Sequence, residues 1–327
     1  MDRASVVPEI SIIVPCYNEA RSLKELRERI ERVLQPSSSY ELIFVDDGSS
    51  DDTRAILSSF CDANTRYIRL RRNFGKTAAL SVGFREARGK IIVTIDSDLQ
   101  DQPEEIPRLL DLMERESLDL VSGWKRDRKD PLTKTIPSRI FNWVTARLTG
   151  IRIHDFNCGL KAYRREVIEE VKVQGEMHRY IPVLASYRGF RVGEVAVSHA
   201  ARRHGRSHYG AGRFMGGFFD LLTVIMLTRY NRKPLHAFGV LGVLLATIGV
   251  LIETYLTIGW FQGLWWLSQR PAFLLGIVLI IIGIQFIFFG LLAEMIAYSS
   301  QRDEDYGAKA VAVRMEFPPE EVRLRKR

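Results

Sequence analysis

Three short clusters of polar residues carry the side chains that could do chemistry in this chain. They occupy residues 15–19, 46–47 and 96–100, and each follows a short apolar run. Carboxylates gathered in one place repel each other unless a cation neutralises them, and a set of oxygen ligands suits Mg²⁺ or Mn²⁺. Such an ion usually keeps one or two protein carboxylates and takes other ligands from phosphate oxygens. The clusters therefore predict a metal-assisted site for a nucleotide diphosphate, provided that the fold brings them together.

The strands and helices around the three clusters are expected to bring them together. Apolar runs at residues 10–14, 42–45, 67–70, 91–95 and 118–121 alternate with stretches of helical character at 19–34, 76–87 and 104–116. Continuously apolar strands that alternate with helices are typical of a mostly parallel sheet covered on both faces. In such a sheet, ligands bind at the carboxyl ends of the strands. The predicted fold class is thus α/β, with all three clusters at that edge.

The order of the motifs resembles a known family. The chain contains Pro15-Cys16-Tyr17-Asn18-Glu19, Val45-Asp46-Asp47-Gly48-Ser49, Arg72-Asn73-Phe74-Gly75-Lys76 and Asp96-Ser97-Asp98-Leu99-Gln100-Asp101-Gln102-Pro103. In this order, and placed after strands, they are similar to the GT-A catalytic domain, a Rossmann-like fold, of glycosyltransferase family 2. The last motif and two apolar C-terminal segments narrow the resemblance to the polyprenyl-phosphate glycosyltransferases, which include dolichol-phosphate mannose synthase and bacterial bactoprenol glucosyltransferase. The resemblance covers residues 8–300.

The resemblance implies a metal-dependent enzyme that transfers a hexose with inversion from a UDP-sugar to a polyprenyl phosphate such as undecaprenyl phosphate. Glucose is the first candidate for the sugar. The residues expected to hold the nucleoside are Pro15, Tyr17, Glu19, Asp46, Lys76 and Asp96. Asp98 and Gln100 match the ligands of a Mg²⁺ or Mn²⁺ ion beside the diphosphate. Such a cation would stabilise the charge that develops on the leaving UDP.

The acceptor side is expected to combine a carboxylate with several cations. Asp155 lies in a segment, residues 155–159, that resembles the acceptor-side motif of the family, and it is the candidate catalytic residue. A phosphate monoester has a second pKa near about 6 and is largely ionised at neutral pH. We therefore expect Asp155 to position the acceptor rather than to act as an indispensable base, with neighbouring His154 as its rival. The groups expected to hold the acceptor phosphate and the diphosphate are Arg126, Arg139, Arg203, Arg206 and Ser207.

Two apolar segments near the C-terminus predict a membrane anchor. Residues 235–300 carry one basic and two acidic residues, whereas residues 1–234 carry 39 basic and 31 acidic residues. The uncharged segment 272–293 would extend roughly 33 Å as a helix, enough to cross a bilayer. Cations precede the first segment and follow the second, so the positive-inside rule places both termini in the cytoplasm. The chain is thus predicted to be an integral protein of the inner membrane with two spans.

The expected organisation has four parts. They are a cytosolic catalytic domain at 1–212, an amphipathic membrane-interface helix at 213–233, a transmembrane hairpin at 234–300 and a cytosolic tail at 301–327. Seven basic residues against one acidic residue between 198 and 234 favour an anionic partner, and the adjoining span favours lipid phosphate over nucleic acid. Three scattered cysteines exclude a disulfide scaffold. Glycines at helical spacing in the spans favour a packed hairpin and leave a homo-oligomer, for example a tetramer, open.

Three alternatives accompany this interpretation. The transferred sugar is also compatible with mannose, galactose, an N-acetylated sugar or an aminoarabinose-type sugar. A processive polysaccharide synthase has the same catalytic domain, but this chain lacks the Gln-x-x-Arg-Trp motif of those enzymes and has only two predicted spans. A non-catalytic membrane adaptor with a degenerate transferase domain would not need the intact set of Asp96, Asp98, Gln100 and Asp155.

Overall fold

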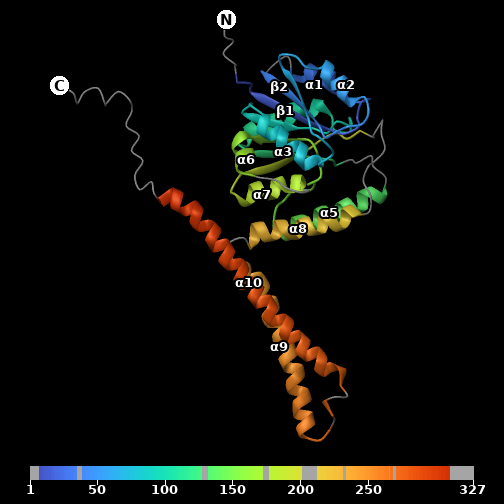
Figure 1. Ribbon diagram of the computed structural model, residues 1–327. Helices are drawn as coiled ribbons and strands as arrows, with labels where there is room; N and C mark the ends of the chain where they lie inside the picture. The colour runs from blue at the N-terminus through green and yellow to red at the C-terminus, as the bar shows by residue number, and fades with distance from the viewer. Residues whose placement is uncertain are drawn as a thin grey trace, which may run out of the picture. The chain divides into compact units, whose positions relative to one another are not determined.

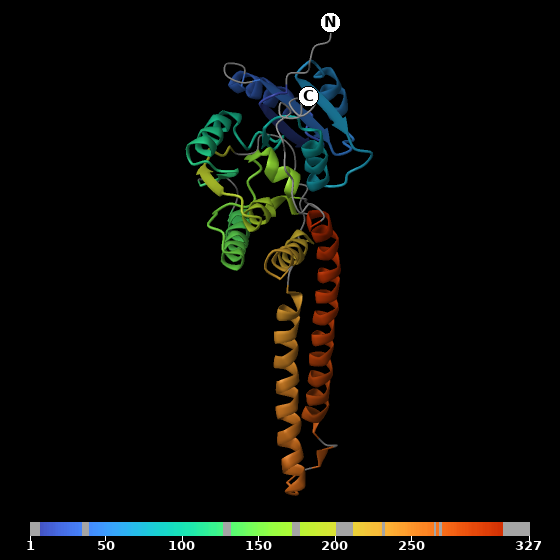
Figure 2. The ribbon, with the colours of Figure 1, turned by 90° about the vertical axis from the view of Figure 1, so that its left-hand side faces the viewer.

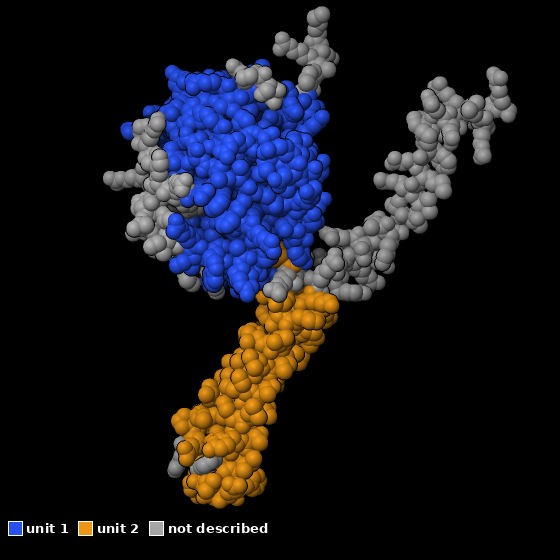
Figure 3. Space-filling model, turned by 180° about the vertical axis from the view of Figure 1, so that it is seen from behind, with its two compact units in different colours: residues 1–225 blue, residues 226–327 orange. Residues whose placement is uncertain are grey.

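The computed structural model describes residues 7–34, 39–126, 132–171, 177–200, 212–230, 233–264, 266–267 and 270–309. The chain divides into two compact units, residues 1–225 and residues 226–327, which Figure 3 colours separately.

The first unit is built on a seven-stranded sheet (Figure 1). Its strands are β1 (Ile10–Cys16), β2 (Tyr40–Asp46), β3 (Thr65–Arg69), β4 (Ile91–Thr94), β5 (Leu120–Trp124), β6 (Lys161–Arg164) and β7 (Val192–Ala196), in the order β3-β2-β1-β4-β6-β5-β7. Among these described strands, β6 runs antiparallel to its neighbours β4 and β5, and the other pairs are parallel. The predicted α/β class with a mostly parallel sheet is confirmed.

Helices cover both faces of this sheet. The described helices up to residue 230 are α1 (Leu23–Leu34), α2 (Thr53–Ser59), α3 (Lys76–Glu86), α4 (Ile106–Arg115), α5 (Leu132–Thr149), α6 (Arg165–Glu170), α7 (Ile181–Tyr187) and α8 (Gly212–Arg229), with 3₁₀ turns at Pro103–Glu105 (η1) and Met177–Tyr180 (η2). Because successive strand residues point to opposite faces, Ile12 and Val14 of β1 pack with α1, α2 and α4, whereas Ile13 packs with α3, α6 and α7. The strands are therefore buried on both sides, as their continuous apolar runs indicate.

The sequence patterns did not indicate β6, β7 or α5. β6 has four residues and a basic residue at each end, and β7 is a half-exposed strand at the edge of the sheet. β6 matters most for the site. Because it runs antiparallel, it begins at the edge where its neighbours end, with Lys161 paired to Thr94. This reversal brings the segment 155–159, which precedes β6, to the carboxyl edge of the sheet.

Helices α5 and α8 share a third cluster of apolar residues in the first unit. Phe141 and Val144 of α5 pack against this cluster, to which α8 contributes Leu221 and Val224. Both helices also expose large apolar residues: Trp143 on α5 is 69% exposed, and Ile140, Phe219 and Leu222 are exposed as well.

The second unit contains a hairpin of two long helices, α9 (Pro234–Phe261) and α10 (Pro271–Lys309) (Figure 2). Residues 234–261 and 271–296 are long and apolar enough to cross a membrane, and only 11% of each apolar window is buried. α10 extends nine residues into the segment that we expected to form a tail.

Glycines allow the two helices of the hairpin to approach closely. A methyl group on Gly242 would lie 2.6 Å from the carbonyl oxygen of Gly283, and one on Gly249 would lie 2.6 Å from that of Gly276. The acidic residue Glu294 of α10 accepts the backbone N–H of Leu235 (3.0 Å) at the start of α9. The glycines thus allow α9 and α10 to pack closely against each other, as their helical spacing in the sequence predicted.

Candidate active site

The loops that follow β1 and β2 form one cross-linked structure at the carboxyl edge of the sheet. The Asn18 N–H donates to Ser49 Oγ (2.9 Å), and the Ser50 N–H donates to Asn18 Oδ1 (2.9 Å). The Glu19 N–H donates to Thr53 Oγ1 (3.1 Å). The structure thereby places Tyr17 and Glu19, which directly follow β1, beside the end of β2.

Asp46 is buried at the end of β2 and holds its surroundings in place. Its carboxylate accepts hydrogen bonds from the Ser49 N–H (2.8 Å) and the Tyr67 hydroxyl (3.2 Å), and Arg69 Nε lies 3.4 Å away. Burial and the charge of Asp46 raise the pKa of Tyr67 to about 12. Asp46 therefore shapes the end of β2, at the position where the nucleoside was predicted.

Asp47 has a bracing role that the sequence did not reveal. Its carboxylate accepts the N–H groups of Phe74 (2.7 Å) and Gly75 (2.8 Å), immediately before Lys76 at the start of α3. Gly48 permits this approach, because its φ is +73° and a methyl group there would lie 2.5 Å from the backbone of Arg72. The motif around residues 72–76 is thus fastened to the end of β2.

Lys76 and Asp96 meet across the site. Lys76 Nζ lies 2.5 Å from Asp96 Oδ1. Burial disfavours ionisation of Asp96, but Lys76 and then Lys125 outweigh burial and hold the pKa of Asp96 below its ordinary value. Gly159 lies against this carboxylate, and a methyl group on Gly159 would be 2.4 Å from Asp96 Cγ. The predicted donor residues Lys76 and Asp96 are therefore in contact, and the acceptor-side segment packs directly on them.

The oxygen donors beyond β4 suit a divalent ion. Asp98 Oδ1 accepts the Gln100 N–H (3.1 Å), and Leu99 between them has a φ of +60°, which makes a tight turn. Within the described parts of the chain, no three acidic, His or Cys side chains converge as they would in an all-protein metal cage. A carboxylate and an amide side chain two residues apart fit Mg²⁺ or Mn²⁺, since these ions take much of their coordination from phosphates and water. Asp98 and Gln100 thus have the donor chemistry that was expected of them.

A buried ion pair connects this loop to β5. Lys125 Nζ lies 2.6 Å from Asp101 Oδ1, and Asp101 has no solvent exposure. Burial disfavours the charge of Lys125, but Asp101 outweighs burial and raises the pKa of Lys125. The Ala200 N–H also donates to the Gln100 carbonyl (3.0 Å). Sequence reasoning assigned no role to Asp101 or Lys125, although Asp101 lies within the motif that carries the predicted metal ligands.

Asp155 is held by backbone groups and is only 1% exposed. Its Oδ1 accepts the Asn157 N–H (3.0 Å), and its Oδ2 accepts the Lys125 N–H (3.4 Å). Beneath it, buried Lys161 donates from Nζ to the carbonyls of Phe156 (3.3 Å) and Cys158. Burial lowers the pKa of Lys161. Asp155 and Lys161 thus organise the acceptor-side segment, and the role of Lys161 was missed because nothing in the sequence marks β6.

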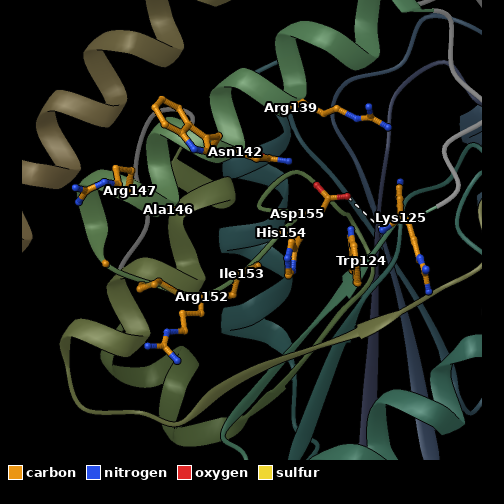
Figure 4. A pocket seen from close by; sticks show the side chains of 14 residues that line it. Trp124, Lys125, Arg139, Asn142, Ala146, Arg147, Arg152, Ile153, His154 and Asp155 are labelled. Atoms are coloured by element: carbon orange, nitrogen blue, oxygen red, sulfur yellow. Dashed lines mark hydrogen bonds between the residues drawn. The ribbon is translucent and has the colours of Figure 1, made fainter.

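A pocket of about 870 Å³ opens between the ends of β5 and α5 (Figure 4). The structure brings Arg126 and Arg139 together with Asp155 in its lining. Its other charged or titratable lining residues are Lys125, Arg147, Arg152 and His154. Arg203, Arg206 and Ser207 lie outside the described residues. Because the pocket is strongly cationic, it suits an anionic ligand.

Comparisons with known proteins agree with this architecture. The profile of "Glycosyl transferase family 2" matches residues 11–172. The chain is 42% identical to dodecaprenyl-phosphate galacturonate synthase of Rhizobium johnstonii over 90% of both chains. It is 36% identical to undecaprenyl-phosphate 4-deoxy-4-formamido-L-arabinose transferase of Pseudomonas syringae pv. syringae over 90% of this chain and 87% of that one. The fold is shared with glucosyl-3-phosphoglycerate synthase from Mycobacterium tuberculosis in complex with Mn²⁺, UDP-glucose and phosphoglyceric acid (TM-score 0.52, 21% identity, 68% of this chain and 79% of that one).

Proposed function

Because the chain belongs to glycosyl transferase family 2 and is thus a glycosyltransferase, we propose that it transfers a sugar from a UDP-sugar to a polyprenyl phosphate. One observation carries this proposal. The Lys125–Asp101 ion pair joins the cationic pocket to the loop after β4, and Gly159, in the segment that begins with pocket residue Asp155, packs on Asp96 in the same loop. A phosphate held in the pocket therefore has a nucleotide sugar as its neighbour.

The reaction is a single displacement with inversion. An oxygen of the acceptor phosphate forms a bond to the anomeric carbon while the bond from that carbon to UDP breaks, and the electron pair leaves with UDP. Arg126 and Arg139 hold the acceptor phosphate, which needs little help in losing its proton near neutral pH. Lys76 and Asp96 orient the donor. Asp98 and Gln100 would hold a divalent ion, which would supply charge stabilisation to the diphosphate.

The transferred sugar is proposed to be a hexuronic acid of the galacturonate type. The relative with 42% identity is named for galacturonate and that with 36% identity for a formamido-arabinose, whereas neither is named for glucose. The uronate accounts better than glucose for a pocket that contains five cationic side chains and a single acidic one.

The proposed location is the cytoplasmic face of a membrane. α9 and α10 have the length and apolarity of spans, and the outward apolar side chains of α5 and α8, Trp143 and Phe219 among them, suit an interface between lipid and water. Both termini are proposed to be cytoplasmic from the distribution of cations. The homo-oligomeric state stays a prediction.

The test is sugar transfer by the full chain in lipid nanodiscs that contain undecaprenyl phosphate. UDP-galacturonate, UDP-galactose and UDP-glucose are supplied in turn, each labelled in the sugar, and label in the organic phase is counted. We expect transfer from UDP-galacturonate above all, and its loss when EDTA removes divalent ions. Transfer of none of the sugars to the lipid would contradict the proposal, and faster transfer of glucose would contradict the choice of sugar.

A further inference from the structure

We infer that the pocket beside Asp155 contains a subsite for a carboxylate on the transferred sugar, and that His154 is the central ligand of this subsite. The inference rests on the proposed function and assigns to named residues the choice between an acidic and a neutral sugar.

The ring of His154 is fixed on two sides. It stacks on the indole of Trp124, with ring centroids 4.4 Å apart and planes inclined by 17°. Glu194 of β7 accepts the His154 backbone N–H (2.8 Å) and pairs with Nδ1 of the imidazole. The side chain of Glu194 is 13% exposed, whereas that of His154 is 65% exposed. With Nδ1 engaged by Glu194, Nε2 is the polar atom left to meet a ligand.

In its imidazolium form, His154 would be a donor to an anion. When both ring nitrogens carry protons, Glu194 balances the charge of the imidazolium, and Nε2 offers a charge-assisted hydrogen bond. The charged groups in the same pocket lining are Lys125 and Arg126 at the end of β5, Arg139 and Arg147 on α5, and Arg152 and Asp155 on the segment that carries His154. Figure 4 shows His154 beside Trp124 and close to Asp155.

The charge of the pocket exceeds what one acceptor phosphate requires. Lys125 is committed to Asp101. The proposed mechanism uses Arg126 and Arg139 for the acceptor phosphate, whose charge approaches −2 at neutral pH. Arg147 and Arg152 remain, and neither pairs with an acidic side chain in the described part of the chain. Arg147 and Arg152 are therefore the cations of the lining that remain for a second anion, in addition to His154.

The second anion is best placed on the sugar. Asp155, next to His154, accepts the backbone N–H of Lys125, whose ammonium group pairs with Asp101 in the loop that carries the donor ligands. The lining of the pocket is therefore connected to the donor loop through direct contacts. On this inference, the sugar of a UDP-sugar bound in that loop extends into the pocket, and a carboxylate on its C6 is recognised before transfer.

The test compares two donors that differ only at C6. UDP-galacturonate carries a carboxylate there, and UDP-galactose carries a neutral CH₂OH group. We expect His154→Gln to lower kcat/KM for UDP-galacturonate by about 10- to 100-fold, the range of one charge-assisted hydrogen bond, and to change the value for UDP-galactose by less than about threefold. Glu194→Gln should likewise lower the ratio of kcat/KM for UDP-galacturonate to kcat/KM for UDP-galactose. Arg188→Gln, on exposed Arg188 at the end of α7, should leave both values unchanged.

Three results would overturn the inference. They are an equal loss of kcat/KM with both donors, a rise in the KM of the lipid acceptor alone, and an unchanged preference for UDP-galacturonate over UDP-galactose in His154→Gln. Equilibrium binding of the two nucleotide sugars to the full chain without lipid provides a separate readout: the wild type should prefer UDP-galacturonate, and His154→Gln should not. If lipid transfer fails with every donor while this binding preference is present and His154-dependent, the proposed function fails and the subsite stands.

Discussion

At the scale of residues, the site depends on a few close approaches. Asp96 is surrounded by the ammonium group of Lys76, the ion pair of Lys125 and the bare backbone of Gly159. Asp155 accepts hydrogen bonds from the backbone N–H groups of Asn157 and Lys125. Because these charged groups are already in position, they need not reorganise during the reaction. A preorganised site of this kind stabilises the charge of the transition state.

Substitution of Gly159 tests the approach to Asp96. In Gly159→Ala, the added methyl group would lie 2.4 Å from Asp96 Cγ, so the carboxylate must shift and its contact with Lys76 is disturbed. We expect the KM for the nucleotide sugar to rise about tenfold, the effect of losing roughly one charged hydrogen bond. Steady-state kinetics on a variant with an unchanged circular dichroism spectrum measures this effect, and an unchanged donor KM would show that Asp96 does not hold the donor.

Asp98 and Asp155 are predicted to act in different steps. Asp98→Ala should abolish transfer and weaken the binding of metal and UDP together. Asp155→Asn should lower turnover while UDP affinity stays nearly unchanged, because Asp155 lines the pocket that we propose for the acceptor phosphate. Calorimetric titration of UDP in the presence of Mn²⁺ separates the two roles, and an equal loss of affinity in both variants would show that they are misassigned.

At the scale of elements, short connections fasten the loops that carry the site. The turn η2 lies beneath the start of α3, where His178 Nδ1 and Thr77 Oγ1 are 2.7 Å apart. Burial, and then the charge of Lys76, lower the pKa of His178 well below its usual value. The folded protein therefore keeps this imidazole neutral beside the predicted donor residue Lys76.

This buried histidine predicts a pH dependence of stability. An unfolded histidine binds a proton below about pH 6.5, whereas His178 in the folded state does so only at lower pH. The unfolded state thus takes up more protons, and stability falls as the pH drops below about 6.5. We expect the Tm of the wild type to fall more steeply between pH 7 and pH 5 than that of His178→Asn. Parallel curves from thermal unfolding would contradict the assignment.

The helical hairpin gives a second test at this scale. A methyl group on Gly283 would lie 2.6 Å from the backbone nitrogen of Ala246, whereas one on Gly239 would meet only Leu235 of its own helix, at 3.4 Å. Gly283→Leu should therefore lower the Tm of the full chain in detergent by several degrees, and Gly239→Leu should lower it much less. Equal effects would indicate that close helix packing does not stabilise the hairpin.

The elements also show what the sequence could predict. The runs that form β1, β2 and β4 are mostly apolar and end in polar clusters, so these strands and the position of Asp46, Asp96 and Asp98 after them could be predicted from the pattern. β6 carries no such pattern, since Lys161 and Arg164 bound it. Its reversed direction, the burial of Lys161 and the Lys125–Asp101 pair arise from tertiary contacts. The stacking of His154 on Trp124 was invisible for the same reason.

At the scale of the whole molecule, the distribution of charge separates chemistry from anchoring. Residues 235–300 carry three formal charges, and of these Glu294 caps the start of α9. The cations of the pocket belong to the first unit. This division suits an enzyme that takes a polar donor from water and an acceptor from lipid.

The proposed transfer of a sugar from UDP to a polyprenyl phosphate is tested by measuring both products of one reaction. The full chain in nanodiscs with undecaprenyl phosphate, UDP-galacturonate and Mn²⁺ is assayed for UDP released and for sugar attached to lipid. We predict one UDP for each lipid-linked sugar, no release without the lipid phosphate, and neither product from Asp98→Ala. UDP release at the same rate without lipid phosphate, or release with no lipid-linked sugar, would contradict the account.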